Sequence, residues 1–164
     1  WALDQDKHPV YIAIPSGPVV HAEDPVRTNF DDLNTYEITR QGSKVVVLAL
    51  GDFYDLGEKT VEALSSTLGI EATLVKPYFA SGVDENLLDN LVKDHDVIVT
   101  IEDGIIEGGW GQNIASYLGT SSARVLNYGV KKAFYDRVNI AELMRESHLE
   151  SELIAADVKQ VLGL

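Results

Sequence analysis

Residues 100–111 read Thr-Ile-Glu-Asp-Gly-Ile-Ile-Glu-Gly-Gly-Trp-Gly, and this stretch decides the fold. It overlaps the end of an apolar run, residues 96–101, that predicts a buried strand, and it leads into residues 112–118, which predict a helix. A strand, a glycine-rich turn and a helix form the unit on which open α/β sheets build their binding sites. For function, it matters whether this turn binds something or only lets the strand and the helix pack closely.

Strands and helices alternate along the chain on both sides of this unit. The pattern predicts strands at residues 36–40, 44–50, 71–77, 96–101 and 124–128. It predicts helices over 56–68 with Gly69 as the C-terminal cap, over 84–92 with Asp84 as the N-terminal cap, and over 111–118. It also predicts a helix from 139 or 140 through 144, and a last one through 162 with Ser151 as the N-terminal cap. Strands that alternate with helices over short loops predict an α/β fold, a parallel-type sheet with helices on both faces.

The composition differs before residue 36. Residues 9–15 form a short apolar run that predicts one strand, which the following Pro-Ser-Gly-Pro cluster ends. Residues 16–35 are rich in Ser, Gly, Pro, Asp and Asn, as linkers are. We therefore expect three parts: residues 1–15 with a closing strand of a preceding, missing domain, a linker over 16–35, and a domain over 36–164. Because the chain does not begin with Met, we expect a piece of a longer protein.

The composition excludes several classes of function. The chain has 164 residues, of which 45% are hydrophobic and 24% charged, as in an ordinary globular domain. Its net charge of −13 argues against binding to nucleic acid or to an anionic membrane, both of which need clustered Lys and Arg. The apolar run at residues 45–50 is far shorter than the roughly 20 residues that span a bilayer. The absence of cysteine excludes disulfides and thiolate metal sites, and we expect a cytoplasmic location.

The candidate site is the glycine-rich turn with its acidic neighbours, and it has two interpretations. Its residues are Glu102, Asp103, Gly104, Glu107, Gly108, Gly109, Trp110 and Gly111. Free backbone N–H groups at the start of a helix form a natural anion site. Glycine also permits close approach of helix to sheet, and three carboxylates nearby would repel a phosphate. Because the spacing is neither a P-loop nor a dinucleotide fingerprint, we favour a role in packing or in an interface.

Two further features of the turn leave alternatives open. The carboxylates of Glu102, Asp103 and Glu107 suit acid–base chemistry or a divalent cation by their position, but carboxylates that are solvated or cap a helix explain them better. Trp110 is either a plug over its own core or an anchor for a partner. These two interpretations of Trp110 carry equal weight.

The remaining polar residues show no catalytic pattern. The four histidines, His8, His21, His95 and His148, have no metal-ligand spacing. The serine pairs at 65–66 and 121–122 lack a nucleophile-elbow motif. Lys131, Lys132 and Arg137 form a local basic cluster that either meets an acidic partner or lies solvated in a loop. We therefore predict no catalytic, cofactor-binding or metal-binding residue in this chain.

Taken together, these segments resemble the C-terminal domain of the thiamine-diphosphate-dependent transketolase family. The resemblance is carried by Val99-Thr-Ile-Glu-Asp-Gly-Ile-Ile-Glu-Gly-Gly-Trp-Gly111, by the strand at 44–51, by Lys76-Pro-Tyr-Phe79 with Val83-Asp-Glu-Asn-Leu-Leu88, and by the last two helices. Residues 9–15 resemble the closing strand of the family's pyrimidine-binding domain. Residues 130–134, Val-Lys-Lys-Ala-Phe, depart from the Pro-Asp-x-Phe run that the family often has there.

The resemblance implies a three-layer α/β/α domain with a five-stranded, mostly parallel mixed sheet whose first strand is antiparallel. It implies that thiamine diphosphate and magnesium are held by the two missing domains, and that this domain is inactive alone. Its partners would be the rest of its own polypeptide and a second subunit in a homodimer. The implied reaction of the whole enzyme condenses pyruvate with glyceraldehyde 3-phosphate, for isoprenoid and thiamine precursors.

Two alternatives stay open beside this interpretation. One is the matching domain of another transketolase or of a 2-oxoacid dehydrogenase β subunit. The other is a stand-alone regulatory or assembly module.

Overall fold

The computed structural model describes residues 1–14 and 27–164, which belong to two compact units, 1–33 and 34–164. In the first unit the Trp1 indole N–H donates to Asp31 Oδ1 at 2.8 Å, and the Trp1 ring meets Phe30 edge to face with ring centroids 5.9 Å apart. The hydrogen bond from Trp1 holds the pKa of the Asp31 carboxyl below its usual value. This unit has no helix or strand among its described residues.

The second unit contains all the regular elements that the structure describes. The strands are β1 (Glu37–Arg40), β2 (Lys44–Ala49), β3 (Thr73–Lys76), β4 (His95–Ile105) and β5 (Arg124–Val130). The α-helices are α1 (Tyr54–Leu68), α2 (Glu85–Leu91), α3 (Trp110–Tyr117), α4 (Ile140–Glu146) and α5 (Ser151–Leu162). Two short 3₁₀ helices, η1 (Gly51–Phe53) and η2 (Leu118–Thr120), precede α1 and follow α3. In the described part of the chain, no helix has the length and apolar character that a membrane crossing requires.

The five strands form one mixed sheet in the order β1-β3-β2-β4-β5. β1 pairs with β3 antiparallel, and the other neighbouring strands pair in parallel. The carboxyl ends of β2, β3, β4 and β5 therefore meet at one edge of the sheet, where open α/β proteins place their sites. The predicted α/β fold and its antiparallel first strand are confirmed.

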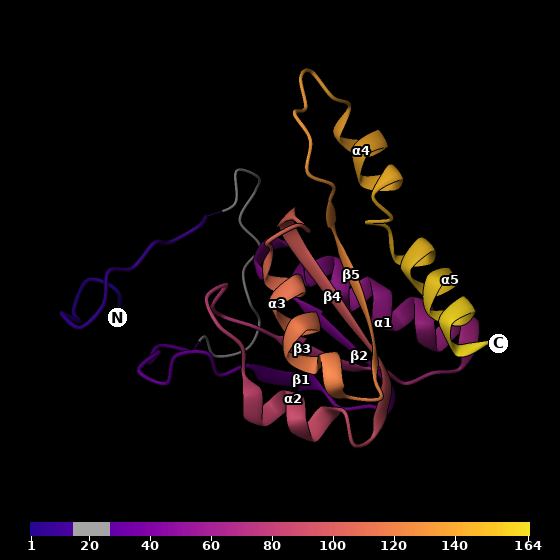
Figure 1. Ribbon diagram of the computed structural model, residues 1–164, viewed down its shortest axis with the longest axis horizontal. Helices are drawn as coiled ribbons and strands as arrows, with labels where there is room; N and C mark the ends of the chain where they lie inside the picture. Colours follow the sequence, from indigo (N-terminus) through magenta and orange to yellow (C-terminus); the bar gives the residue numbers. More distant parts are fainter. Residues whose placement is uncertain (15–26) are drawn as a thin grey trace. The chain divides into compact units, whose positions relative to one another are not determined.

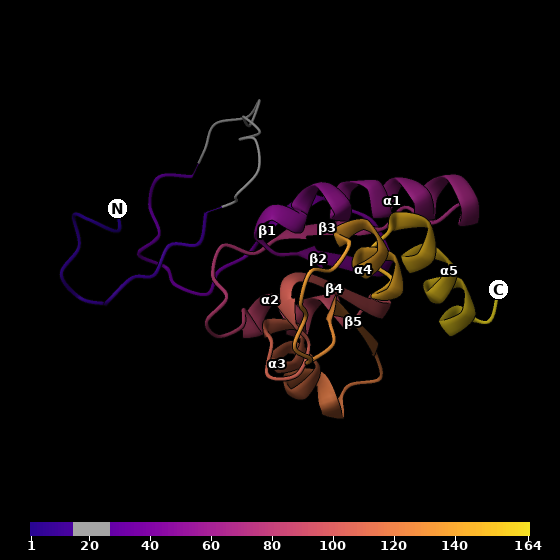
Figure 2. The ribbon, with the colours of Figure 1, turned by 90° about the horizontal axis from the view of Figure 1, so that it is seen from above.

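Helices cover both faces of the sheet, which gives three layers (Figures 1 and 2). On one face, alternate residues of the central strands pack with apolar residues of α1 and α5, among them Val47, Leu64 and Ile154. On the other face, the intervening strand residues pack with α2 and α3 through Leu48, Leu88 and similar side chains. Successive side chains of a strand point to opposite faces of the sheet. Each central strand therefore contributes residues to both cores.

The helix caps follow local chemistry, with one correction. Gly69 ends α1 with φ 65°, the left-handed conformation that favours glycine, and the Asp84 carboxylate accepts from Leu87 N–H at 3.0 Å at the start of α2. Both predicted caps are confirmed. The cap predicted at Ser151 is wrong: Ser151 is the first residue of α5, and its hydroxyl donates to the Glu152 carboxylate. The N-cap of α5 is Glu150, which makes no side-chain cap bond.

Several strand bounds also differ from the prediction: β3 is shorter, at Thr73–Lys76, and β5 continues two residues further, to Val130. β4 continues four residues past Ile101, to Ile105, which pairs with Val130 of β5. Residues 9–14, the described part of the predicted strand at 9–15, form no strand, because a strand exists only where a neighbouring strand bonds to its backbone. That this segment completes a sheet of another domain stays a prediction. Most of the predicted linker, residues 15–26, lies outside the described residues.

Candidate functional site

The glycine-rich turn closes the carboxyl end of β4 onto the amino end of α3. Ile106 N–H donates to Val130 O at 3.0 Å, which holds the start of the turn against β5. Gly109 N–H donates to Ile106 O at 2.9 Å, which makes the turn tight. Gly108 has φ 82°, a conformation that L side chains rarely adopt, so the backbone itself requires glycine there.

The side chain of Glu102 fills the amino end of α3. Its Oε2 accepts from Trp110 N–H at 2.9 Å, and its Oε1 accepts from Gly111 N–H at 2.8 Å. The residue is only 6% exposed, so these bonds satisfy a carboxylate that is removed from water. The N–H groups at the start of a helix carry partial positive charge and favour an anion. The anion site that the sequence pattern indicated is thus present, and the chain's own carboxylate occupies it.

Two glycines of the turn make room for that carboxylate. A Cβ on Gly109 would lie 2.7 Å from Glu102 Oε1, and a Cβ on Gly111 would lie 2.3 Å from Thr100 Oγ1. Real Cβ atoms essentially never come so close to another heavy atom. The glycines therefore serve close packing of α3 on β4, one of the two roles considered from the sequence.

A second strand contributes to the same polar cluster. The Thr100 hydroxyl donates to Asn127 Oδ1 of β5 at 2.8 Å, and Thr100 is fully buried. A Cβ on Gly111 would also lie 3.2 Å from Asn127 Oδ1. Thr100 and Asn127 were not singled out from the sequence, because the parallel pairing of β4 with β5 that brings them together is a long-range feature.

Trp110 belongs to the core of its own domain. It is 3% exposed, and its indole N–H donates to the Tyr36 hydroxyl at 3.0 Å. The two rings meet edge to face with centroids 6.0 Å apart. Burial raises the pKa of Tyr36 above its usual value, while the bond from Trp110 acts in the opposite direction. Of the two interpretations of Trp110, the structure supports the plug, and a buried ring of this kind offers no anchor at the surface.

The three acidic residues of the candidate site do not converge. Glu102 is buried under α3, Asp103 is exposed, and the Glu107 carboxylate accepts from the backbone N–H of Lys132 at 2.9 Å. Gly104, which follows Asp103 in the chain, is half-buried and lies in the last part of β4. Within residues 1–14 and 27–164, no group of three or more His, Asp or Glu side chains is arranged to hold a metal ion.

His95 links several elements at the opposite, amino end of the sheet. Its Nδ1 lies 2.8 Å from Leu91 O, which only accepts, so Nδ1 carries a proton. Its Nε2 lies 2.8 Å from Thr73 Oγ1, which also accepts from Gly42 N–H at 2.9 Å. In the neutral tautomer Nε2 therefore accepts the proton of the Thr73 hydroxyl. This network joins β3, β4, α2 and the β1–β2 turn, and its role is structural.

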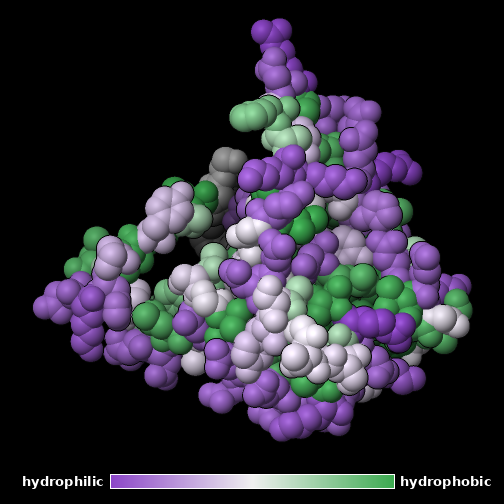
Figure 3. Space-filling view, viewed as in Figure 1, coloured by the Kyte–Doolittle hydropathy of each residue, from purple (hydrophilic) through white to green (hydrophobic). Residues whose placement is uncertain are grey.

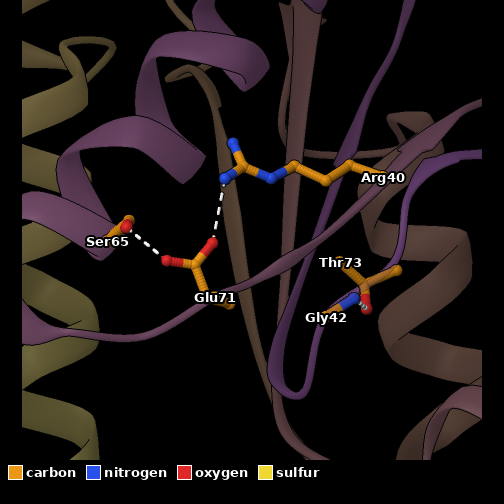
Figure 4. Close-up of polar contacts among 5 residues, drawn as sticks. All are labelled: Arg40, Gly42, Ser65, Glu71 and Thr73. Atoms are coloured by element: carbon orange, nitrogen blue, oxygen red, sulfur yellow. Dashed lines mark hydrogen bonds and ion pairs between the residues drawn. The ribbon is translucent and has the colours of Figure 1, made fainter.

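Glu71 makes a neighbouring cluster at the same end, shown in Figure 4 with Gly42 and Thr73. Its carboxylate accepts from the Ser65 hydroxyl at 2.5 Å and from the Arg40 guanidinium at 2.9 Å. The bond from Ser65 and the charge of Arg40 hold the pKa of Glu71 below its usual value. Ser65 and Glu71 thus tie the end of α1 to Arg40 of β1.

The other histidines are not part of a site. His148 Nδ1 lies 2.7 Å from Asp157 Oδ2, which also accepts from the Tyr128 hydroxyl at 3.0 Å. Burial, and then the charge of Asp157, raise the pKa of Tyr128 well above its usual value. This cluster fastens α5 to β5. His8 is exposed, and His21 lies outside the described residues.

Comparison with known proteins identifies the class. The family model for the transketolase C-terminal domain matches residues 34–154, so the chain belongs to this family. A 1-deoxy-D-xylulose-5-phosphate synthase of Pseudoalteromonas translucida is 32% identical over 94% of this chain and 24% of its own length. A synthase of the same name from Clostridium tetani is 26% identical over 99% of this chain and 26% of its length. The predicted family is confirmed, and the chain spans about a quarter of these relatives.

Solved structures confirm the three-layer fold. A protein described as a split gene transketolase, in an inactive beta4 tetramer, matches with a TM-score of 0.74 and 24% identity over 90% of this chain and 47% of its own. A Pichia stipitis transketolase matches with a TM-score of 0.53 and 16% identity over 77% of this chain and 18% of its own. At these identities the likeness concerns the fold alone.

Proposed function

We propose that this chain is the C-terminal domain of a 1-deoxy-D-xylulose-5-phosphate synthase. In the full-length enzyme, pyruvate and glyceraldehyde 3-phosphate would be condensed with loss of carbon dioxide, in a cytoplasmic homodimer. The relatives with this name support the proposal, because they match nearly the whole chain, which spans about a quarter of their length. The domain itself would serve assembly and support of the active site, and would not be catalytic alone.

The observation that carries this division of labour is the occupied amino end of α3. A diphosphate needs N–H donors or cations, and here Trp110 and Gly111 already donate to the carboxylate of Glu102. A second anion in the same place would meet a like charge in a buried setting. The amino end of α3 is therefore unsuited to thiamine diphosphate. This supports assigning the cofactor and its magnesium to the two domains that precede this one in the family.

Titration calorimetry tests this assignment. Thiamine diphosphate with magnesium is titrated into the 164-residue chain and, as the positive control, into the full-length relative from Pseudoalteromonas translucida. We expect heat of binding only for the relative. Binding to the chain alone with a micromolar dissociation constant would overturn the proposed role.

A chimaera tests the identity of the parent enzyme. Residues 34–164 replace the matching segment of the Pseudoalteromonas translucida synthase, and condensation of pyruvate with glyceraldehyde 3-phosphate is compared with that of the truncated relative. We expect the chimaera to regain activity that the truncated form lacks. A chimaera that is folded and dimeric but no more active than the truncated form would contradict the proposal.

Transketolase itself is the second candidate, because the family model that matches residues 34–154 is that of the transketolase C-terminal domain. A chimaera in which residues 34–164 replace the matching segment of a transketolase separates the two candidates. It is assayed for transfer of a two-carbon unit between sugar phosphates. Higher recovery in the transketolase than in the synthase would favour this candidate.

A further inference from the structure

The loop between β5 and α4 presents apolar side chains to solvent. Phe134 is fully exposed and Ile140 is 68% exposed, and Tyr135 and Val138 are each exposed by about 40% (42% and 41%). In Figure 1 this segment, residues 131–139, extends past the carboxyl ends of the strands before the chain turns back into α4. Figure 3 shows hydrophobic and hydrophilic residues side by side on this part of the surface. Exposed apolar groups rimmed by charges are typical of interaction sites.

The charge of this segment is opposite to that of the chain. Residues 131–140 contain three basic residues, Lys131, Lys132 and Arg137, and one acidic residue, Asp136. The rest of the chain then holds 10 of the 13 basic and 25 of the 26 acidic residues. The segment is a basic and apolar projection on an acidic domain. Its natural partner is an acidic surface with an apolar floor.

Hydrogen bonds shape the loop before any partner binds. Its first turn is fixed because Lys132 N–H donates to the Glu107 carboxylate at 2.9 Å and the Tyr135 hydroxyl donates to Lys131 O at 2.8 Å. At its end, Asn139 Oδ1 caps α4 by accepting from Ala141 N–H at 3.0 Å. A loop held at both ends loses less conformational entropy on binding than a free one.

A groove of the matching chemistry lies at the same end of the sheet. It measures about 350 Å³ and lies between the amino end of α1 and α4. Its lining residues are Asp52, Phe53, Asp55, Leu56, Lys59 and Met144. Phe53, Leu56 and Met144 supply an apolar floor. Asp52 and Asp55 supply negative charge, of which Lys59 offsets part through its 2.5 Å ion pair with Asp55.

We propose that the β5–α4 loop of one chain docks in the α1–α4 groove of a second copy, with Phe134 as the apolar anchor. This inference rests on the proposed function, because it names the surface through which the domain serves assembly. α1 follows the carboxyl end of β2 and the loop follows the carboxyl end of β5, and these parallel strands end at one edge of the sheet. Loop and groove therefore face the same way, and two copies related by a two-fold axis exchange loops reciprocally.

A second copy is the occupant that the charges favour. Lys131 and Arg137 would meet Asp52 and Asp55 of the other chain, which relieves part of the repulsion expected between two chains of net charge −13. In the 34–164 unit, Lys131 makes no ion pair with a described residue, and Arg137 has only a 4.0 Å contact with exposed Asp136. The basic groups are therefore available without the loss of a strong internal bond.

Sedimentation of the 164-residue chain over a concentration series from micromolar to submillimolar tests the interface. We expect a reversible dimer whose dissociation constant rises with salt, and rises about thirtyfold in Phe134→Asp, as for a central aromatic anchor. Leu164→Asp, a matched change at an exposed apolar residue outside the loop, should leave the dissociation constant unchanged. A chain that stays monomeric, or a dimer indifferent to Phe134→Asp, would overturn the proposal.

A charge swap identifies the two faces. One variant carries Lys131→Glu and Arg137→Glu, and the other carries Asp52→Lys and Asp55→Lys. Each alone should dimerise more weakly, because loop and groove then carry like charges, whereas an equimolar mixture should form heterodimers as tight as the unmodified chain. Mixtures that dimerise no better than their components would refute the assignment. That result would leave the thiamine diphosphate titration untouched, so the two proposals fail separately.

Discussion

Two loops follow neighbouring strands of one sheet and use their residues in opposite ways. In the turn after β4, the polar groups are satisfied within the domain, because Glu102 accepts from the start of α3 and Trp110 is buried against Tyr36. In the loop after β5, the aromatic and basic groups of Phe134 and Lys131 point to solvent. The more conspicuous motif is therefore internal, and the less conspicuous one offers a surface.

The difference shows how a ligand-like motif can serve stability. A glycine-rich turn before a helix attracts an anion, and in this chain the anion is supplied eight residues earlier by Glu102. A loop whose aromatic and basic side chains have no such partners within the domain can use them to bind another molecule. Substitutions in the first loop should change the free energy of unfolding, and substitutions in the second should change association.

The largest effect is expected for Trp110→Ala. Removal of a buried indole leaves a cavity, and changes of this kind cost about 3–5 kcal/mol. The comparison is with Phe134→Ala, which removes a fully exposed ring and should cost less than about 0.5 kcal/mol. Urea unfolding of both variants at low concentration measures the difference. Equal losses of unfolding free energy would show that Trp110 and Phe134 do not differ in burial as described.

A slightly smaller effect is expected for Gly111→Ala. The new Cβ would lie 2.3 Å from Thr100 Oγ1 and 3.1 Å from Glu102 Oε1, and α3 must shift away from β4 to relieve these contacts. Overpacking of this kind costs about 3 kcal/mol. Gly119→Ala is the matched control, because nothing lies within 4 Å of its Cβ position. Thermal denaturation that ranks the two variants equally would argue against close packing as the function of Gly111.

The anion at the start of α3 is tested by Glu102→Ala. Loss of two charged hydrogen bonds at a helix start should cost about 2 kcal/mol. The space left beside the N–H groups of Trp110 and Gly111 should then accept an external anion. Sulfate should therefore stabilise the variant more than the unmodified chain, when both are compared with chloride at equal ionic strength. Equal stabilisation by sulfate would mean that the emptied helix end binds no anion.

The sequence predicted local features of this region and missed those that depend on distant pairing. Strand, turn and helix at 96–118 follow from apolar periodicity, and the caps at Gly69 and Asp84 follow from residue type. The extension of β4 to Ile105 depends on its pairing with Val130, which no short window contains. The burial of Glu102 had a weak signal, an acidic residue directly after an apolar strand and shortly before a helix. Its bond to α3 is a contact between two elements and is not encoded by either one.

The smallest effect on folding is expected for Phe134→Asp, and it joins folding to assembly. At concentrations where the chain is monomeric, the free energy of unfolding should change by less than about 0.5 kcal/mol, because the ring makes no buried contact. As concentration rises, dimer formation should stabilise the unmodified chain by mass action, whereas the variant, whose dimer is weaker, should gain less at each concentration. Unfolding curves at several protein concentrations would separate the effect on folding from the effect on dimer formation. Parallel curves at every concentration would show that the loop after β5, like the turn after β4, acts only within its own domain.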